Sequence, residues 1–391
     1  MPLHRAAPPA LMASVLLSLA ACSQSGGSGP GPAGAAGTTG ATGSSAGGPI
    51  QVTATDTACT VSSTTAPAGT ITFQVRNTGT KVNEFYVYGP GERVIAEVEN
   101  VSPGLSRELK VQITEPGSFQ TACKPGMVGS GIRADFTVTG TATATSADAK
   151  VTTAIADYKA YVAHQAEELV EGTGKFADAV KAGKVAEAKA LYPKARGHWE
   201  EIEPVAESFG DLDPKIDGRE DIIAEGVAFT GYHRLEKDLW VDGLKPDSAQ
   251  IADQLLADVR QIQTESTKVE LNALQIANGS KALLDEVATG KITGEEERYS
   301  HTDLWDFDGN LKGSKSALAA LRPVLQDRAP ALPAALDQRF AALEKLLGSH
   351  QVGDGFKLYT DLSQDDIKAL TVALDALSEQ VAKVPAAVEQ K

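Results

Sequence analysis

Apolar and polar residues alternate in the first part of the chain, and this alternation predicts strands. Ile71, Phe73 and Val75 fall on one face with polar residues between them, and residues 132–138 repeat the pattern. Turn sequences rich in glycine, proline and asparagine separate such stretches, at residues 77–79, 89–91, 103–104 and 115–117. Short strands at this spacing are typical of a β-sandwich, so we expect an all-β domain over residues 49–140.

Beyond a small-residue run at residues 141–149, the apolar residues recur at helical spacing. The region is rich in alanine, leucine, glutamate and lysine, which favour helix. Apolar residues follow one another at steps of three or four, for example Ile251, Leu255, Val259 and Ile262. Loop signals interrupt the pattern, among them residues 172–174, 278–279 and 309–310. We therefore predict an all-α domain of the helical-bundle type over residues 150–391.

A weak internal echo indicates that this helical region is duplicated. Residues 197–200 and residues 300–306 each place a histidine beside tryptophan and carboxylates. A duplicated four-helix bundle would explain the echo.

The beginning of the chain predicts export. Residues 1–21 read as a signal peptide, with an apolar stretch too short to span a membrane comfortably. The stretch ends at Leu19-Ala20-Ala21-Cys22, which resembles a bacterial lipobox and implies cleavage before Cys22 and lipidation of its thiol. A plain signal peptide with a nearby cysteine is the alternative. Residues 22–48 are almost wholly small residues and predict a flexible tether, so we expect an extracytoplasmic protein, lipid-anchored to the cell membrane or periplasmic.

The formal net charge of −15 narrows the range of partners. Such a charge argues against nucleic acid and against an anionic lipid surface as charge-driven partners. It suits a protein that collects cations.

The segment from His198 to Glu203 carries the most informative chemistry. On a helix, His198 falls within an apolar stripe, while Glu201 and Glu203 flank the stripe and Glu200 points roughly away from it. The stripe consists of Trp199, Ile202, Val205, Ala206 and Phe209. An imidazole bordered by carboxylates suits borderline to hard metals such as iron, zinc or manganese, although an acidic run is also common on a solvated helix face.

Two further groups extend the list of candidate metal ligands. His233 precedes Glu236 by one helical turn, and Glu236 lies close to the apolar side of that helix, where a carboxylate needs a partner. That partner is either a metal ion or Arg234. Asp217 follows in the acidic run after His198, and Glu297 belongs to a second acidic run before His301.

The β-domain resembles a cupredoxin in the order of its polar residues. Glu84 follows an early strand, and Cys123 and Met127 stand in the loop before the last strand. No histidine occurs between His4 and His164, so the two histidines and cysteine of an ordinary blue-copper centre are not all present. Three alternatives remain open for the cysteines Cys59 and Cys123. They form an unusual copper or iron site with Glu84 and Met127, a structural disulfide, or idle thiols.

The helical strings 198–214, 231–240 and 297–307 resemble the EfeO-type members of the imelysin family. A cupredoxin-like domain before an imelysin-like domain is the architecture of that family, so the resemblance covers the whole mature chain. It implies an iron-uptake component that acts with a membrane iron permease and a haem-containing peroxidase. The family's His-x-x-Glu pattern falls on His198 and Glu201. Further ligand candidates are Glu200, Glu203 and Asp217, followed by His233, Glu236 and Glu297.

These observations lead to one preferred function and two alternatives. The preferred function is capture of ferrous or ferric iron outside the membrane and its delivery to the permease, without catalysis unless iron is oxidised on site. The first alternative is an imelysin-type metallopeptidase that uses zinc, but the His-Glu-x-x-His string of zinc peptidases does not occur. The second is a protein that binds an anionic polymer through a metal ion.

Overall fold

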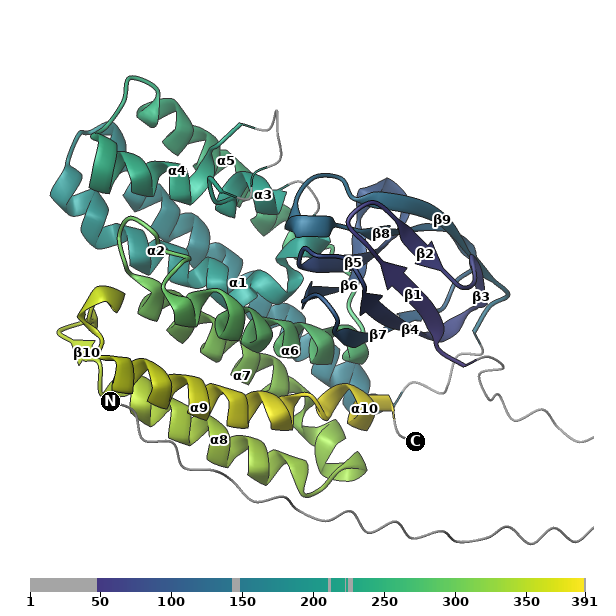
Figure 1. Cartoon of the computed structure of the whole chain (residues 1–391). Helices are drawn as coiled ribbons and strands as arrows, with labels where there is room; N and C mark the ends of the chain where they lie inside the picture. Colours follow the sequence, from purple (N-terminus) through teal and green to yellow (C-terminus); the bar gives the residue numbers. More distant parts are fainter. Residues whose placement is uncertain (1–47, 143–147, 210–211, 222, 224–227, 390–391) are drawn as a thin grey trace, which may run out of the picture. The chain divides into compact units, whose positions relative to one another are not determined.

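The computed structural model describes residues 48–142, 148–209, 212–221, 223 and 228–389. The strands of the sandwich come first along the chain and the long helices afterwards (Figure 1). The predicted order, a β-sandwich followed by an all-α domain, is confirmed. The predicted signal peptide, the tether and the lipidation of Cys22 lie outside the described residues, apart from Gly48 at the end of the tether.

Two sheets form the sandwich, and neighbouring strands in each are hydrogen-bonded. The four-stranded sheet has the order β2-β1-β4-β7, and the five-stranded sheet has the order β3-β9-β8-β5-β6. The strands are β1 (Ile50–Ala54), β2 (Cys59–Val61), β3 (Thr65–Pro67), β4 (Gly69–Asn77), β5 (Asn83–Tyr88), β6 (Val94–Val101), β7 (Ser106–Ile113), β8 (Gly117–Cys123) and β9 (Ile132–Thr139).

The alternating residues of the sequence make the core of the sandwich. Ile71, Phe73 and Val75 of β4 are all buried, as the alternation predicts. The ring of Phe73 lies 5.2 Å from that of Phe85 and 5.4 Å from that of Phe136, which both come from the other sheet. Tilted aromatic pairs at this separation stabilise a core beyond the area that they bury.

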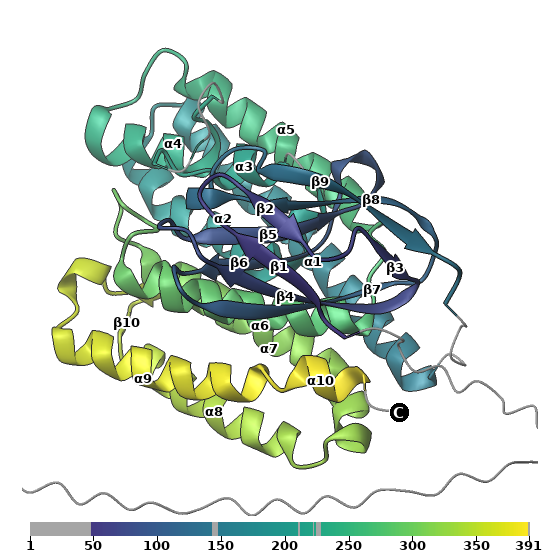
Figure 2. The ribbon, with the colours of Figure 1, turned by 45° about the vertical axis from the view of Figure 1, so that its right-hand side comes forward.

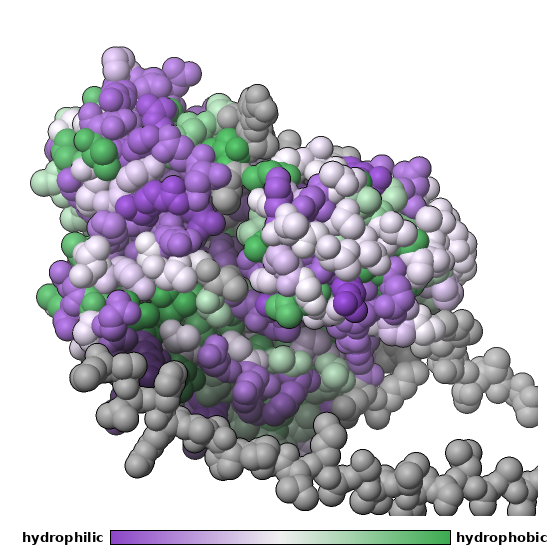
Figure 3. Space-filling model, viewed as in Figure 1, coloured by the Kyte–Doolittle hydropathy of each residue, from purple (hydrophilic) through white to green (hydrophobic). Residues whose placement is uncertain are grey.

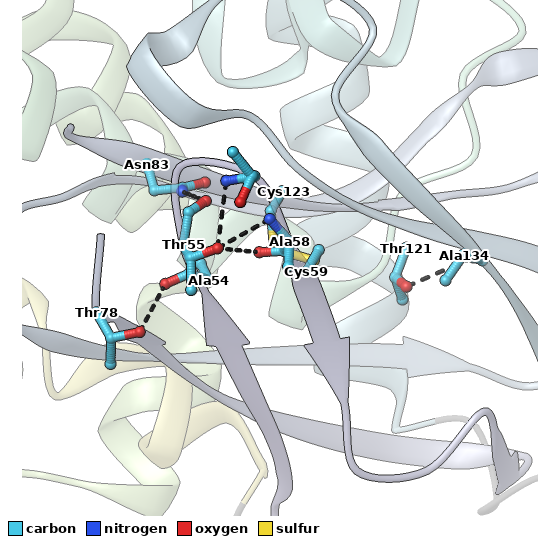
Figure 4. The surroundings of a disulfide bond; sticks show 10 residues. Ala54, Thr55, Ala58, Cys59, Thr78, Asn83, Thr121, Cys123 and Ala134 are labelled. Atoms are coloured by element: carbon cyan, nitrogen blue, oxygen red, sulfur yellow. Dashed lines mark hydrogen bonds between the residues drawn. A yellow bond between two sulfur atoms is a disulfide. The ribbon is translucent and has the colours of Figure 1, made fainter. Parts of the chain in front are cut away.

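A disulfide joins the two sheets through Cys59 at the start of β2 and Cys123 at the end of β8 (Figure 4). Their Cα atoms lie 5.5 Å apart, within the normal range for a bridged pair. Both sulfur atoms are therefore bonded and neither is a thiolate. Of the three alternatives that the sequence left open, a metal site that uses Cys59 and Cys123 as ligands is wrong for this structure, and so are idle thiols.

The helical part is built from long helices with short connections. They are α1 (Ala149–Lys181), α2 (Val185–Ala206), α3 (Leu212–Asp217), α4 (Gly231–Lys237), α5 (Ser248–Ser266), α6 (Ala273–Thr289), α7 (Asp303–Arg328), α8 (Leu332–Gly348), α9 (Gln364–Val381) and α10 (Val384–Glu389). A π-helical turn (Asp238–Asp242) follows α4, and two short strands, β10 (Gln351–Val352) and β11 (Gly355–Phe356), pair between α8 and α9. The duplication of a four-helix bundle stays a prediction.

Helix α2 lies at the centre of the helical part, where it packs against α1 and α7 (Figures 1 and 2). Trp199, Ile202 and Val205 on its apolar stripe are buried, as predicted. Glycines allow the close approach of its neighbours. A Cβ atom on Gly309 of α7 would lie 2.6 Å from Cβ of Glu200, and one on Gly172 of α1 would lie 3.1 Å from Cα of Ala195.

The described residues form one compact unit, in which strands β6 and β7 contact helix α6. Arg107 of β7 lies 2.8 Å from Asp285 of α6, and Nζ of Lys110 lies 2.9 Å from Oε2 of Glu389 in α10. Asn278 of α6 donates a hydrogen bond to the carbonyl of Lys110 at 2.8 Å. Through these contacts one side of the sandwich rests on the helical part.

The surface in Figure 3 differs between the two parts. Hydrophilic residues dominate over α4 and α5, whereas pale residues of intermediate hydropathy cover much of the sandwich. Within the described parts of the chain, no helix combines the length and the apolar character that a membrane span requires.

Candidate functional site

The candidate site is organised by one face of helix α2. Arg196, Glu200 and Glu203 follow at spacings of four and three residues, so they lie on the same side of the helix. Arg196 and Glu200 are fully buried. Glu200, which was expected to point away from the apolar stripe, is buried all the same, because α7 covers this second side of α2 through its small residues Gly309 and Gly313.

Arg196 lies at the centre of a group of carboxylates from several segments. Its NH2 atom lies 2.7 Å from Glu200 and 3.1 Å from Glu296, and its Nε atom lies 2.6 Å from Glu297. Asp217 also contacts the guanidinium. Four carboxylates from α2, α3 and the 295–297 acidic run thus converge on one cation.

His233 brings a buried imidazole to the same group. Its Nε2 atom lies 3.4 Å from Oδ1 of Asp217 and 3.6 Å from Oε1 of Glu296, and its Nδ1 atom lies 3.2 Å from Oε2 of Glu236. Two sets of three residues therefore have possible ligand atoms within 4.8 Å of one another: Asp217, His233 and Glu296, and His233, Glu236 and Glu297.

Neighbouring donors fix the carboxylates around His233. Oε1 of Glu236 accepts backbone hydrogen bonds from Tyr299 at 2.9 Å and from Ser300 at 2.7 Å. Nε1 of Trp199 donates to Oδ2 of Asp217 at 3.1 Å. Nε2 of His233 and Oδ1 of Asp217, in contrast, are buried and have no hydrogen-bond partner among the described residues. These two atoms lie 3.4 Å apart, and Oδ1 of Asp217 also contacts the guanidinium of Arg196.

A close contact between two short helices places His233 beside Asp217. Gly231, the first residue of α4, has a φ of +76° and lies so close to the end of α3 that a Cβ atom would overlap the carbonyl oxygens of Lys215 and Ile216. Asp217 follows Ile216 directly, and His233 stands two residues after Gly231. Only glycine combines this left-handed conformation with such close packing.

A second buried cation, Lys291, gathers another set of carboxylates. Its Nζ atom lies 2.5 Å from Glu200, 3.0 Å from Glu203 and 3.4 Å from Glu286. Nδ2 of Asn310 in α7 also donates to Glu200 and Glu203, at 2.9 and 2.8 Å. Glu200 therefore connects the Lys291 group to the Arg196 group.

Acidic groups outnumber basic ones around Arg196 and Lys291. Burial and neighbouring carboxyl groups raise the pKa values of several of them. Burial and the nearby Glu203 raise the pKa of Glu200 to about 7 despite Lys291 and Arg196. Burial also raises the pKa of Asp303 to about 7 and that of Asp306 well above its usual range. A carboxyl group that resists ionisation in this way gains strongly from an added cation.

His233 and Glu296 shift in the opposite sense, toward their charged forms. Burial and Arg196 lower the pKa of His233, but the hydrogen bond with Glu236 and the nearby carboxylates of Glu296 and Glu297 outweigh them and raise it to about 9. Burial opposes ionisation of Glu296, yet the positive charge of Arg219 and the nearby imidazole of His233 hold its pKa well below the usual range. Without a metal ion, the imidazolium of His233 is thus one of the cations that balance the site.

A cavity of about 620 Å³ leads from the sandwich to these carboxylates. Glu84, Glu97, Glu99, Lys124 and Met127 line it on the side of the sandwich, and Glu203, Asp213, Asp217, Glu286 and Glu296 line it on the side of the helices. Burial raises the pKa of Asp213 to about 6 and that of Glu203 to about 7. The opening is therefore acidic on both sides and gives cations a path to Asp217 and Glu296.

The sequence-predicted ligand candidates lie in three places. Glu200, Glu203, Asp217, His233, Glu236 and Glu297 come together in the region described above. His198 and Glu201 point to helix α1 instead. Nδ1 of His198 lies 2.8 Å from Oε1 of Gln165, and Glu201 accepts a hydrogen bond from Tyr161 at 2.6 Å. Glu84 and Met127 line the cavity without the cysteines.

Several residues of the site were not named as candidate ligands from the sequence. They are Arg196, Glu286, Lys291, Glu296, Asp303, Asp306 and Asn310. The spacing of four residues between Arg196 and Glu200 was a usable signal, because it places both on one helix face. Lys291 carries no comparable signal, since only the folded chain brings it to α2.

Comparisons with known proteins agree with this architecture. A model of the imelysin family matches residues 154–384, and a model of the cupredoxin-like domain matches residues 11–138. The iron uptake system component EfeO of Escherichia coli O157:H7 is 40% identical over 342 residues, which cover 86% of this chain and 90% of that protein. The protein of the same name from Escherichia coli strain K12 is 39% identical with the same coverage.

A solved structure, reduced auracyanin from Roseiflexus castenholzii, also matches part of the chain. It is 19% identical, with a TM-score of 0.19, and the match covers 23% of this chain and 96% of that one.

Proposed function

We propose, from the premise that this chain belongs to the EfeO-type imelysin family, that it is the extracytoplasmic metal-binding component of an iron-uptake system. It captures iron at a site of one histidine and several carboxylates and delivers it to a membrane iron permease. The relatives that support this proposal are named iron uptake system components.

The observation that carries the proposal is the pairing of Nε2 of His233 with two carboxylates. Nε2 faces Asp217 at 3.4 Å and Glu296 at 3.6 Å and has no hydrogen-bond partner among the described residues. Its other ring nitrogen lies 3.2 Å from Glu236. A metal-binding imidazole typically donates its second N–H to a carboxylate in this manner, which fixes the ring and the tautomer.

Imidazole with two carboxylates is a donor set that suits iron. Mixed nitrogen and oxygen ligands favour borderline to hard metals, and three protein ligands leave coordination positions open for water or for a receiving ligand. An open site is appropriate for cargo, because the ion has to leave again. Zinc and manganese satisfy the same donors, so selection of iron also depends on which metal is available.

Two further positions belong to the proposal as alternatives. His198 and Glu201 carry the family's His-x-x-Glu pattern and lie beside Tyr161 and Gln165, outside the His233 group. In the sandwich, Glu84 and Met127 offer one carboxylate and one thioether to the cavity for copper or iron.

The cellular setting is proposed from the sequence and the family together. The lipobox-like segment before Cys22 would anchor the protein to the cell membrane, and the disulfide Cys59–Cys123 suits an oxidising compartment. The partners would be the membrane iron permease and the haem-containing peroxidase of the same system.

The proposal is tested by titration of the purified protein with ferrous iron under anaerobic conditions. We compare the wild type with Asp217→Asn/His233→Ala, with His198→Ala/Glu201→Ala, and with His350→Ala. His350 is buried but belongs to the segment after α8, so its variant controls for the loss of a buried histidine.

We expect Asp217→Asn/His233→Ala to lose iron binding and to keep its helicity. His350→Ala should keep the iron affinity of the wild type. Loss of binding only in the His198/Glu201 variant would move the site to α1 and α2. A wild-type protein that binds no iron would refute the proposed function.

A further inference from the structure

Arg196 has an unusual environment for an arginine side chain. It is fully buried, and all of its charged nitrogens face carboxylates: Glu200, Asp217, Glu296, Glu297 and Asp306. These acids come from α2, α3, α7 and the 295–297 acidic run. The guanidinium is therefore the internal counterion of the whole group.

The oxygens that contact Arg196 are the ones that face His233. Oδ1 of Asp217 contacts both NH1 of Arg196 and Nε2 of His233. Oε1 of Glu296 lies 3.1 Å from NH2 of Arg196 and 3.6 Å from Nε2 of His233. Oε1 of Glu297 lies 2.6 Å from Nε of Arg196 and 4.0 Å from Nδ1 of His233. A metal ion beside His233 would need the same oxygens that the arginine now holds.

Charge rather than directed hydrogen bonding holds Arg196 in this position. NH2 donates a hydrogen bond to Glu296, but Nε and NH1 have no partner with hydrogen-bond geometry among the described residues. Arginine normally binds carboxylates through parallel, well-aligned hydrogen bonds. A guanidinium that is held by charge alone, without this alignment, can be displaced by another cation of sufficient charge.

We infer that Arg196 competes with the metal ion for Asp217, Glu296 and Glu297 and is displaced when the ion binds. The inference rests on the proposed metal site at His233. A monovalent ion gains no more from these carboxylates than the guanidinium does, whereas a divalent or trivalent ion gains more because Coulomb attraction grows with its charge. Arg196 thereby selects multivalent cations and keeps their binding weak enough for release.

The variants Arg196→Gln and Arg219→Gln test the inference. Arg219 is the matched control because it contacts the other oxygen of Glu296, Oε2, at 2.5 Å. For each purified protein we measure the affinity for ferrous iron by anaerobic titration and its weakening by added sodium chloride, with circular dichroism as the check of folding.

We expect Arg196→Gln to bind ferrous iron at least about tenfold more tightly than the wild type, because a positive neighbour weakens cation binding. Iron binding by this variant should also become sensitive to sodium ions, and the gain for Arg219→Gln should be smaller. A folded Arg196→Gln variant whose iron affinity equals or falls below that of the wild type would overturn the inference. It would show that the arginine only positions the carboxylates.

A measurement on the unaltered chain covers the case in which Arg196→Gln does not fold. The Nε–H resonance of Arg196 is followed by nuclear magnetic resonance in arginine-labelled wild-type protein during titration with Zn²⁺, a diamagnetic cation. Displacement predicts a large shift of this resonance and faster exchange of its hydrogen with water. An unchanged resonance at saturating Zn²⁺ would overturn the inference, whereas absence of any Zn²⁺ or iron binding would count against the proposed metal site itself.

Discussion

His233 and Glu236 face each other across one turn of helix α4, with Nδ1 of the imidazole 3.2 Å from Oε2 of the carboxylate. The other oxygen of Glu236 accepts two backbone hydrogen bonds, from Tyr299 and Ser300. Because Glu236 is held from both sides, it orients the imidazole and directs Nε2 toward Asp217 and Glu296. In this account Glu236 is a positioning residue, and Asp217, His233 and Glu296 are the ligands.

The variant Glu236→Gln should weaken iron binding by about 10- to 100-fold, the usual effect of losing a carboxylate that orients a metal-binding histidine. An amide oxygen can still accept the backbone hydrogen bonds, so we expect the helical content to be unchanged. Anaerobic iron titration and circular dichroism measure the two effects. Glu220→Gln, which alters a half-exposed carboxylate paired with Lys237, is the control. Equal iron affinities of the two variants would show that Glu236 does not position the imidazole.

The stability of the metal-free protein should fall as the pH rises above 6.5. The pKa of His233 is raised from 6.5 to about 9 in the folded protein, so the folded state holds this proton more tightly than the unfolded state. The stabilisation is complete below pH 6.5 and is lost as the pH rises through 9, by about 1.4 kcal/mol per unit of pKa difference.

Denaturant unfolding at a series of pH values between 6 and 9 measures this loss. His233→Gln should flatten the decline, while His350→Gln should leave it as in the wild type. The carboxyl groups of Glu200 and Glu203, with pKa values of about 7, add a decline of the same sign between pH 4.5 and 7. If the stability of His233→Gln falls with rising pH as much as that of the wild type, other titrating groups cause the fall.

Gly231→Ala should destabilise the protein and weaken iron binding together. The alanine would have to adopt a left-handed conformation, which costs about 1–3 kcal/mol, and its Cβ atom would push α4 away from the end of α3. Gly243 also has a left-handed φ, of +77°, but nothing lies within 4 Å of an added Cβ atom there. Gly243→Ala should therefore lose stability only. Thermal unfolding and iron titration of both variants check the comparison, and unchanged iron affinity in Gly231→Ala would contradict it.

Reduction of the disulfide Cys59–Cys123 should destabilise the sandwich by about 2–4 kcal/mol, because the bridge restricts the unfolded chain. Counting free thiols in the oxidised, unfolded protein should find neither Cys59 nor Cys123 reactive. Copper added to the oxidised protein should produce no intense blue band, since the sandwich has no histidine and its thiols are bonded. An intense blue band would contradict both the absence of a blue-copper centre and the bonding of the two thiols.

Much of the fold follows from local patterns. The alternation at Ile71, Phe73 and Val75 predicts buried strand positions, and the stripe through Trp199 and Ile202 predicts the packed face of α2, because each depends only on the period of its element. The loops that were wrongly predicted all contain a glycine. The loop signals at residues 172–174, 278–279 and 309–310 lie inside α1, α6 and α7. At Gly172 and Gly309 the lack of a side chain serves the close approach of another helix instead of a turn.

The candidate site could be predicted only in part, for a similar reason. His233 and Glu236 were recognisable as a pair one turn apart, since both belong to the same helix. The burial of Glu200 was not predicted, because the sequence of a single helix shows its apolar stripe but not a second, polar side that α7 covers. The contacts of Glu200 with Lys291 and of Glu296 with His233 join residues far apart in the sequence, and no pattern in a single sequence reports them.

The position of bound iron tests the central claim most directly. Crystals of the purified protein are grown with ferrous iron under anaerobic conditions. X-ray data collected on both sides of the iron absorption edge would then locate the ion by its anomalous scattering. The account predicts a peak between Nε2 of His233 and the carboxylates of Asp217 and Glu296, with the guanidinium of Arg196 moved away from them. A peak beside His198 and Glu201, or one only at Glu84 and Met127, would contradict it.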